Sequence, residues 1–385
     1  MSPDFEPEIL ELADIMRDFM NTQVIPAEHK WATQRDELGL DRALPVVDEL
    51  RRKSSRRGLW NLLQPQAAGI THVESAMIAR ITGWSPLLAP ESINSQDPDY
   101  GNMNVLEVYA SEFQSETWLE PLLDGATRSA WAMTEPAERL ADRTPGAVTA
   151  TSRGDEYVLN GHLNFVAGIA DERCSFMVLI AQTAPANGTG PELTAFIVPI
   201  PTAGVAIETD IDARDYLPQL RLSRVTLSDV SVSHANVLGA VGDGARVLGS
   251  RLRLGRINRA MRSLGMADRA LSNVAHQDDP HEQASAWLRQ CTLVIGAVQD
   301  RILALAKRLD DPTAQVPCNA EISHAAEEAH SLALSISREA NSYLQGHNSE
   351  DAELITYFED WITGMRSFDA ADAMNPIAVD SVTSH

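Results

Sequence analysis

Six residues in the middle of the chain combine a thioether, a hydroxyl and a carboxylate: Trp131-Ala132-Met133-Thr134-Glu135-Pro136. The stretch follows sequence that predicts helices and precedes sequence that predicts short strands. It therefore marks a junction against which a cofactor could sit. A threonine at the start of a strand more often bonds the local main chain, and both roles stay open for Thr134. The cysteines, at positions 174, 291 and 318, are too few and too scattered for a disulfide framework or a zinc site.

Composition narrows the class of protein. The chain has 385 residues, 44% of them apolar, which is an ordinary globular composition with room for two or three subdomains. Its formal net charge of -23 argues against a nucleic-acid partner and against an anionic membrane surface. The N-terminus lacks the apolar segment of a signal peptide, and no run approaches the length of a transmembrane helix. We expect a soluble, cytoplasmic protein without a metal site.

Residues 1–130 are predicted to form an N-terminal α-helical domain. Apolar residues at the start of the chain recur at helical spacing and predict a helix that ends near Pro26. The stretch 94–102 is predicted as a loop because it contains Pro98 and Gly101. Further helices are expected at 43–53, 73–83, 105–110 and 117–123.

Residues 131–240 are predicted to form a central β domain. Two apolar runs flank Arg153-Gly154-Asp155-Glu156, a pattern typical of a hairpin. Short strands joined by Gly, Pro and Asn favour an antiparallel sandwich or small barrel. The other expected strands cover 176–181, 193–200, 205–207, 224–227 and 230–232.

Residues 241–385 are predicted to form a C-terminal helical bundle. Long helical patterns separated by short loops predict four antiparallel helices. Their expected ranges are 247–275, 282–309, 319–344 and 351–368. The fold class is therefore α+β, in the order helical domain, β domain, four-helix bundle.

This order, with Met133-Thr134-Glu135-Pro136 at the first junction, resembles the acyl-CoA dehydrogenase family over nearly the whole chain. Residues 94–103 and 255–265 look most like a branch that in animals includes long acyl-CoA dehydrogenases fused to a kinase-like domain. Other strings agree with the family: Trp118-Leu-Glu-Pro-Leu-Leu-Asp-Gly125, Tyr157-Val-Leu-Asn-Gly161, Val237-Leu-Gly239, Gly242-Asp-Gly244 and Gly255-Arg256-Ile257.

The resemblance implies a flavoenzyme that binds FAD between the β domain and the bundle. A carboxylate would remove the α-proton of an acyl thioester while the β-hydride passes to the flavin. The cofactor positions matched by resemblance are Met133, Thr134, Phe165, Ala167 and Gly346. Phe165 stands where the family has an aromatic residue, and the neighbouring hydroxyl residues of the family are replaced. The family's phosphate-binding arginine segment is replaced by the acidic stretch 276–282.

The catalytic positions implied by the resemblance are Asp369 and Arg256. Asp369 lines up with the base, after Met365 and Arg366, and could instead be a helix-terminal carboxylate. Arg256 lies near the site in the family and could instead form a salt bridge within the bundle. Four further positions, implied to border the substrate, are Gln96, Asn102, Ala141 and Asp142.

Three functions follow from these matches. The first is a FAD-dependent oxidoreductase acting on an acyl thioester or related small molecule. The second is a flavin-free enzyme on this fold, doing acid–base or cyclisation chemistry in specialised metabolism. The third is a non-catalytic subunit of a hetero-oligomeric dehydrogenase. Apolar residues on the predicted helices 282–309 and 319–344 further suggest a homodimer or homotetramer (Trp287, Leu288, Leu293, Val294 and Ile295; Leu332, Leu334 and Ile336).

Overall fold

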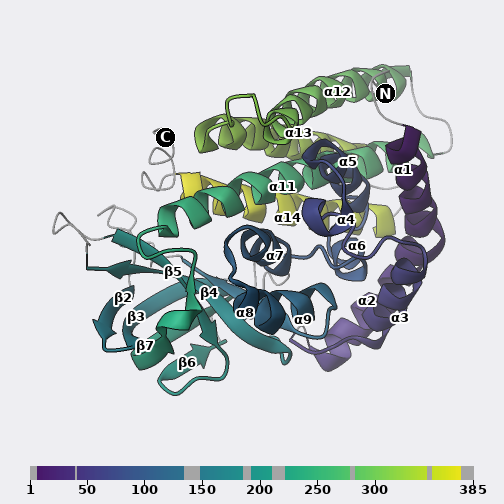
Figure 1. The fold of residues 1–385 in the computed structure, drawn as a ribbon. Helices are drawn as coiled ribbons and strands as arrows, with labels where there is room; N and C mark the ends of the chain where they lie inside the picture. The colour runs from purple at the N-terminus through teal and green to yellow at the C-terminus, as the bar shows by residue number, and fades with distance from the viewer. Residues whose placement is uncertain are drawn as a thin grey trace. The chain divides into compact units, whose positions relative to one another are not determined.

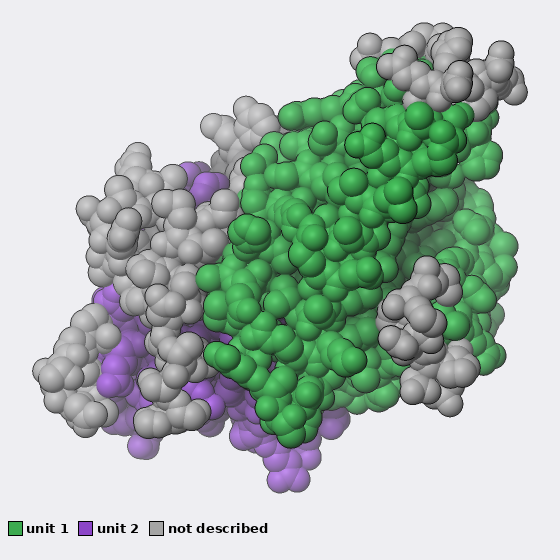
Figure 2. Space-filling view, turned by 90° about the horizontal axis from the view of Figure 1, so that it is seen from above, with its two compact units in different colours: residues 1–33, 45–93, 255–372 green, residues 34–44, 94–254, 373–385 purple. Residues whose placement is uncertain are grey.

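A computed structural model describes residues 7–39, 41–133, 148–184, 192–209, 222–277, 282–344 and 349–373. The fold is mixed α and β, with N-terminal helices, a central sheet and four long C-terminal helices (Figure 1). The chain divides into two compact units, coloured separately in Figure 2. Unit 1 comprises Met1–Thr33, Pro45–Ile93 and Gly255–Asp372, and unit 2 comprises Gln34–Leu44, Asn94–Leu254 and Ala373–His385. None of the helices in the described ranges is both long enough and apolar enough to span a bilayer.

The described part of unit 1 is built from helices. The four long C-terminal helices follow the predicted ranges closely: α11 (Gly244–Ala275), α12 (Glu282–Asp310), α13 (Asn319–Leu344) and α14 (Ser349–Ala373). Helix α12 packs against α13 and against α5. The N-terminal elements are α1 (Pro7–Phe19), η1 (Met20–Val24), α2 (Ile25–Leu38), α3 (Pro45–Arg56), α4 (Pro65–Ala68), α5 (His72–Thr82) and α6 (Leu88–Ser92). The last residues of α2 and the first residues of α11 belong to unit 2.

The prediction that the first helix ends near Pro26 is wrong. The helical path runs from Pro7 to Leu38, with the π-helical turn η1 just before the proline. A proline ring normally clashes with the carbonyl four residues earlier, and a wider turn moves that carbonyl away. The same arrangement recurs at Pro121, which follows a second π-helical turn, η2 (Ser115–Leu119), in α9 (Glu120–Leu123).

Helices α5 and α11 touch backbone to backbone through two glycines. A Cβ atom on Gly265 would lie 1.9 Å from the carbonyl oxygen of Arg80, and one on Gly83 would lie 2.1 Å from that of Arg262. No larger residue fits at such a crossing without moving a helix. The contact brings Arg80 beside Asp268, and two nitrogens of its guanidinium donate to the carboxylate at 2.7 Å each.

Unit 2 contains an eight-stranded sheet in the order β6-β7-β3-β1-β4-β5-β8, with β2 pairing β3 and β4. Most pairs are antiparallel, as expected, but β1 and β2 each run parallel to β4, which the sequence analysis did not predict. It also did not predict β1, and it divided β7 into two strands. The strands are β1 (Arg128–Ala132), β2 (Val148–Arg153), β3 (Glu156–Ala167), β4 (Cys174–Thr183), β5 (Glu192–Pro199), β6 (Val205–Glu208), β7 (Leu222–Ser233) and β8 (Val237–Leu238).

Both faces of the central strands are buried. Along β4, Met177 and Leu179 join one apolar cluster, while Phe176 and Val178 join another, as the alternation of strand side chains requires. The second cluster includes Met103 of helix α7 (Asp99–Tyr109) and residues of α9 and the start of α11. A sheet covered on both faces fixes the ends of its strands firmly. The end of β1 contains Trp131 and Ala132, the first two residues of the stretch 131–136, called the junction string below.

Candidate functional site

Two segments matched to the cofactor are neighbours in the sheet. Strand β1 pairs antiparallel with β3 in a register that sets Trp131 opposite Ala167. Met133 directly follows β1, and Phe165 lies in β3 two residues before Ala167. The side chains of both residues are partly exposed, and Met133 also packs against the second apolar cluster. The sheet therefore joins two stretches that lie more than thirty residues apart in the sequence.

The backbone at Phe165 is unusual. Its φ is +59°, in the left-handed region that few residues other than glycine adopt. The pairing of β3 with β7 also shifts register between Leu163 and Val166, as at a β-bulge. Bulges and positive φ values re-aim side chains and are common at functional sites. The unusual backbone conformation therefore indicates that the orientation of the Phe165 side chain is held by the surrounding structure.

Several matched residues lie outside the described part of the chain. Thr134, Ala141, Asp142 and Gly346 belong to this group. Asp369 lies in helix α14, but its side chain is not among those described. Their predicted roles stay predictions.

Gln96 and Asn102, matched to the substrate pocket, are buried in unit 2. The prediction of a loop through residue 102 is wrong, because Asn102 lies in the first turn of α7. Its amide nitrogen donates to Ser129 Oγ at 2.9 Å and to the Ala130 carbonyl at 3.0 Å. The amide of Gln96 donates to Asp99 Oδ2 at 2.7 Å. Both amides make internal hydrogen bonds: Asn102 holds β1 directly, and Gln96 holds Asp99, which in turn binds β1.

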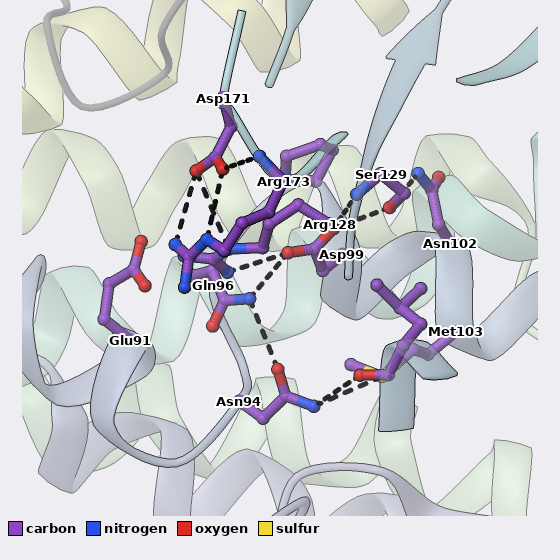
Figure 3. A network of polar contacts seen from close by, with 12 residues as sticks. Glu91, Asn94, Gln96, Asp99, Asn102, Met103, Arg128, Ser129, Asp171 and Arg173 are labelled. Carbon is purple, nitrogen blue, oxygen red and sulfur yellow. Dashed lines mark hydrogen bonds and ion pairs between the residues drawn. The ribbon is translucent and has the colours of Figure 1, made fainter. Parts of the chain in front are cut away.

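Asp99 is the centre of this buried network, shown in Figure 3. Its carboxylate accepts from Arg128 Nη1 at 2.8 Å, from Ser129 N at 2.7 Å and from Ser129 Oγ at 2.6 Å. Arg128 also lies 3.8 Å from a second buried carboxylate, Asp171. Buried charges are tolerated only when paired and hydrogen-bonded, as these are. The network clamps the first residues of β1 to the start of α7.

Asp171 continues the network to the loop before β4. It accepts from the main-chain nitrogen of Arg173 at 2.9 Å and from its Nε at 3.3 Å. The next residue, Cys174, is buried, and burial raises the pKa of its thiol to about 12, with Asp99 and Asp171 adding to the effect. A thiol with that pKa stays protonated at neutral pH and is a poor nucleophile. Cys174 is therefore a packing residue.

Arg251 links α11 to the junction string. Its guanidinium carbon lies 4.0 Å from the centroid of the Trp131 ring, and its Nε donates to Asn102 Oδ1 at 3.2 Å. A guanidinium over an indole face is a favourable cation–π arrangement. This contact holds Trp131 two residues before Met133. The sequence analysis missed Arg251, and its spacing in an arginine-rich helix gave no signal of the role.

Arg253 is a second residue that the sequence did not single out. It is half-buried, and burial lowers the pKa of its guanidinium. Within the ranges that the structure describes, no carboxylate pairs with it. A partly desolvated guanidinium without a counter-ion attracts anions, so Arg253 is suited to an anionic part of a ligand. Arg256, the matched catalytic arginine, lies further along α11 and is completely buried.

The described cofactor positions can be tested against a flavin. Met133 and Phe165 provide partly exposed apolar side chains that suit the face of a flat ring. Val166 and Ala167 carry no hydroxyl, so hydrogen bonds to ring heteroatoms would come from the main chain or from Thr134. The residues fit the face of the ring, while the phosphate-binding positions lie mostly outside the described ranges.

Comparison with known proteins places the chain among acyl-CoA dehydrogenases. No family model matches the chain. It is 37% identical over 259 residues to "Probable acyl-CoA dehydrogenase FadE2" of Mycobacterium tuberculosis, covering 67% of this chain and 64% of that protein. It is 30% identical over 312 residues to "Acyl-CoA dehydrogenase family member 11" of Gallus gallus, covering 77% of this chain and 40% of that protein. The chain thus spans less than two thirds of either relative.

The fold comparison covers nearly the whole chain. A solved structure of a Mycobacterium abscessus protein assigned to the acyl-CoA dehydrogenases is similar with a TM-score of 0.84 and 26% identity. The match covers 98% of both chains. The fold, the junction string and the relatives agree, and the chain belongs to the acyl-CoA dehydrogenase family.

Proposed function

We propose that this protein is a FAD-dependent oxidoreductase that oxidises the Cα–Cβ bond of an acyl thioester. The observation that supports the proposal is the pairing of Trp131, in the junction string, with Ala167, two residues after Phe165, in a chain of this family. FAD, when bound, would supply the hydride acceptor that side chains lack. Met133, Thr134, Phe165, Ala167 and Gly346 would hold it.

The chain's own residues would bind the thioester and move the proton. Asp369 would remove the proton from the carbon next to the thioester carbonyl, since a carboxylate within reach of that proton can act as general base. Ala141 and Asp142, after the junction string, would border the acyl group, together with Gln96 and Asn102. Arg253 would contact an anionic part of the carrier, and Arg256 would lie near the reacting group.

Anaerobic mixing with acyl-CoA thioesters of short, medium and long chain tests this proposal. The wild-type protein loaded with FAD should lose its flavin absorbance on mixing with at least one of them. Asp369→Asn should keep the bound flavin but slow this reduction by about 100-fold or more. The matched control, Asp372→Asn on the same helix, should be reduced at the wild-type rate. Equal rates for the two variants would remove Asp369 from the role of base.

A flavin-free enzyme is the second candidate, and one observation favours it. Val166 and Ala167 stand where the family has hydroxyl residues, and Val166 is fully buried in the apolar core of the sheet. A protein that binds acyl thioesters but takes up no FAD would support this candidate. Titration calorimetry with acyl-CoA and with FAD, run separately, distinguishes the two.

We also propose that the protein is a homodimer or homotetramer. Of the apolar residues that suggested an interface, Ile295, Leu334 and Ile336 are buried within unit 1. Leu293 and Val294 on α12 remain exposed, with 76% and 42% of their surface accessible. Exposed apolar residues side by side on a long helix favour a contact with another copy.

A further inference from the structure

Unit 1 contains a cavity of about 580 Å³ that no part of the proposed function uses. Its walls come from α1, η1, α5, α11 and α12, together with the segment after α5. The volume falls within the range of pockets that hold small organic molecules, roughly 300–1,000 Å³. None of the residues matched to flavin or substrate lines it.

One part of the wall is apolar and rich in sulfur. Met20, Met77, Ile81 and Trp84 contribute to it from η1, α5 and the segment that follows α5. Methionine side chains adapt to irregular ligands and contact aromatic rings favourably. Met77, Ile81 and Trp84 are only partly buried, so apolar surface is left open on the cavity side. A ligand with an apolar, flat body would cover it.

The charged groups of the wall neutralise one another. Arg80 donates to Asp268 through two nitrogens at 2.7 Å each, and its third nitrogen donates to the side chain of Gln299. Arg17, the other cation in the wall, pairs with Asp14 at 2.7 Å. An anionic ligand would meet the Asp268 carboxylate, and a cationic ligand would meet Arg80. The wall therefore favours an uncharged molecule.

The presence of glycine at position 296 is the feature of the cavity wall that points most directly to a ligand. Gly296 lies inside α12, a 29-residue helix, where glycine is less favourable than almost any other residue. Its φ is not positive, and a Cβ atom built on it would meet no atom within 4 Å. Neither backbone conformation nor close packing within unit 1 requires glycine here. Gly296 lines the cavity, one turn from Thr292 and one turn from Gln299, so its missing side chain keeps the cavity open.

We propose that this cavity binds an uncharged, largely apolar small molecule with a flat ring system, separate from the substrate site. The ligand stacks on Trp84 and the two methionines, and Thr292 and Gln299 provide polar contacts at its edge. The site is independent of FAD, because all of its residues belong to unit 1 and none is matched to the cofactor.

Fluorescence titration with 1-aminoanthracene, a neutral aromatic probe, tests the proposal on the full-length protein as purified. The wild-type protein should enhance the probe's emission saturably, with one site per chain. Its sulfonated, anionic analogue should bind at least about tenfold more weakly, because it would bring an unpaired charge to the wall. Gly296→Leu should fill the cavity and weaken probe binding at least about tenfold.

The matched control is Ala297→Leu, which adds the same side chain to the exposed neighbour of Gly296. It should bind the probe as the wild type does. Circular dichroism and the melting temperature establish that both variants fold. If Gly296→Leu fails to fold, Trp84→Ala provides a second variant, which should weaken binding by removing the stacking surface.

Two results would overturn the proposal. One is probe binding that is equal in Gly296→Leu and Ala297→Leu. The other is that the wild-type protein is an oligomer, whereas Gly296→Leu is dissociated and binds the probe with unchanged affinity. That result would show that the glycine makes room for another copy of the chain. Neither result depends on flavin content, so failure here is distinct from failure of the proposed function.

Discussion

Gly101 leaves room for the Arg251 side chain, which holds Trp131 at the start of the junction string. A Cβ atom at this position would lie 2.8 Å from the guanidinium carbon of Arg251. The same guanidinium stacks on Trp131, two residues before Met133. Gly101 thus admits the arginine that fixes the end of β1. Glycine is an unfavourable residue in a helix, so its presence in the first turn of α7 is explained by this close approach.

We expect Gly101→Ala to displace Arg251 from the Trp131 ring. Overpacking of a buried site of this kind destabilises by about 1–3 kcal/mol, and the Trp131 fluorescence should change with it. Urea unfolding and tryptophan emission measure the two effects. Gly296→Ala is the control, because a methyl group fits there and should be neutral or stabilising by up to about 1 kcal/mol. Equal effects of the two substitutions would contradict the assignment.

Asp99 should be among the residues most sensitive to a change of charge. Asp99→Asn removes the negative partner of buried Arg128, and breaking a buried ion pair costs about 3–5 kcal/mol. Asp124→Asn, at an exposed position, should change the free energy of unfolding by about 0.5 kcal/mol or less. Denaturant unfolding of both variants provides the comparison. If Asp99→Asn lowers the free energy of unfolding no more than Asp124→Asn does, the network is dispensable for stability.

At the scale of elements, periodic patterns predicted the long helices well. The bounds of α11 to α14 and of the hairpin β2–β3 follow from apolar spacing and turn residues in the sequence alone. Strand β1 was missed because its sequence, Arg-Ser-Ala-Trp-Ala, shows neither alternation nor a continuous apolar run, although all five residues are buried. Its polar residues Arg128 and Ser129 are buried through their bonds to Asp99. The helix through Pro26 was missed because a π-helical turn leaves no mark in the sequence.

The candidate site was predictable only in part, for a related reason. Resemblance pointed to Met133, Phe165 and Ala167, and β1 pairs with β3 beside them, through Trp131 and Ala167. The contacts of Asn102 and Arg251 depend on tertiary structure, since their partners lie 27 to 149 residues away in the chain. Local residue types at Pro98 and Gly101 favoured a loop, whereas burial against β1 stabilises a helix.

The start of α13 is expected to respond to acid through Glu321. Hydrogen bonds from Arg308 and from the main-chain nitrogen of Cys318 lower the pKa of this carboxylate from 4.5 to about 2. A carboxylate whose pKa is lower in the folded state than in the unfolded state stabilises the fold at pH values above its unfolded-state pKa. That stabilisation is lost as the pH falls through the folded-state pKa. Glu321 should therefore stabilise α13 above pH 4.5 and progressively less down to about pH 2.

Thermal unfolding across this range tests the effect. Glu321→Gln should be less stable than the wild type near neutral pH, and the difference should shrink as pH falls through the window. Arg308→Gln should show the same narrowing, because it removes the other member of the pair. A difference between wild type and Glu321→Gln that stays constant from pH 7 to the bottom of the window would contradict the role of this pair.

At the scale of the whole molecule, the exposed apolar residues on α12 lead to a prediction about assembly. Leu293→Arg should shift the protein from a dimer or tetramer toward a smaller species, since a charge disfavours burial in an apolar contact. Val316→Arg is the control, at an exposed apolar position outside α12. Sedimentation velocity at micromolar concentration measures both variants. A monomeric wild-type protein under these conditions would refute the assembly.

The absorbance spectrum of the purified protein, taken before and after incubation with FAD and gel filtration, tests the central claim most directly. A FAD-dependent oxidoreductase should show the bound-flavin band at about 450 nm in at least the loaded sample. The position of this band should shift when Phe165, one of the residues proposed to hold FAD, is replaced by leucine. A protein that is colourless as isolated and retains no flavin after loading would contradict the account.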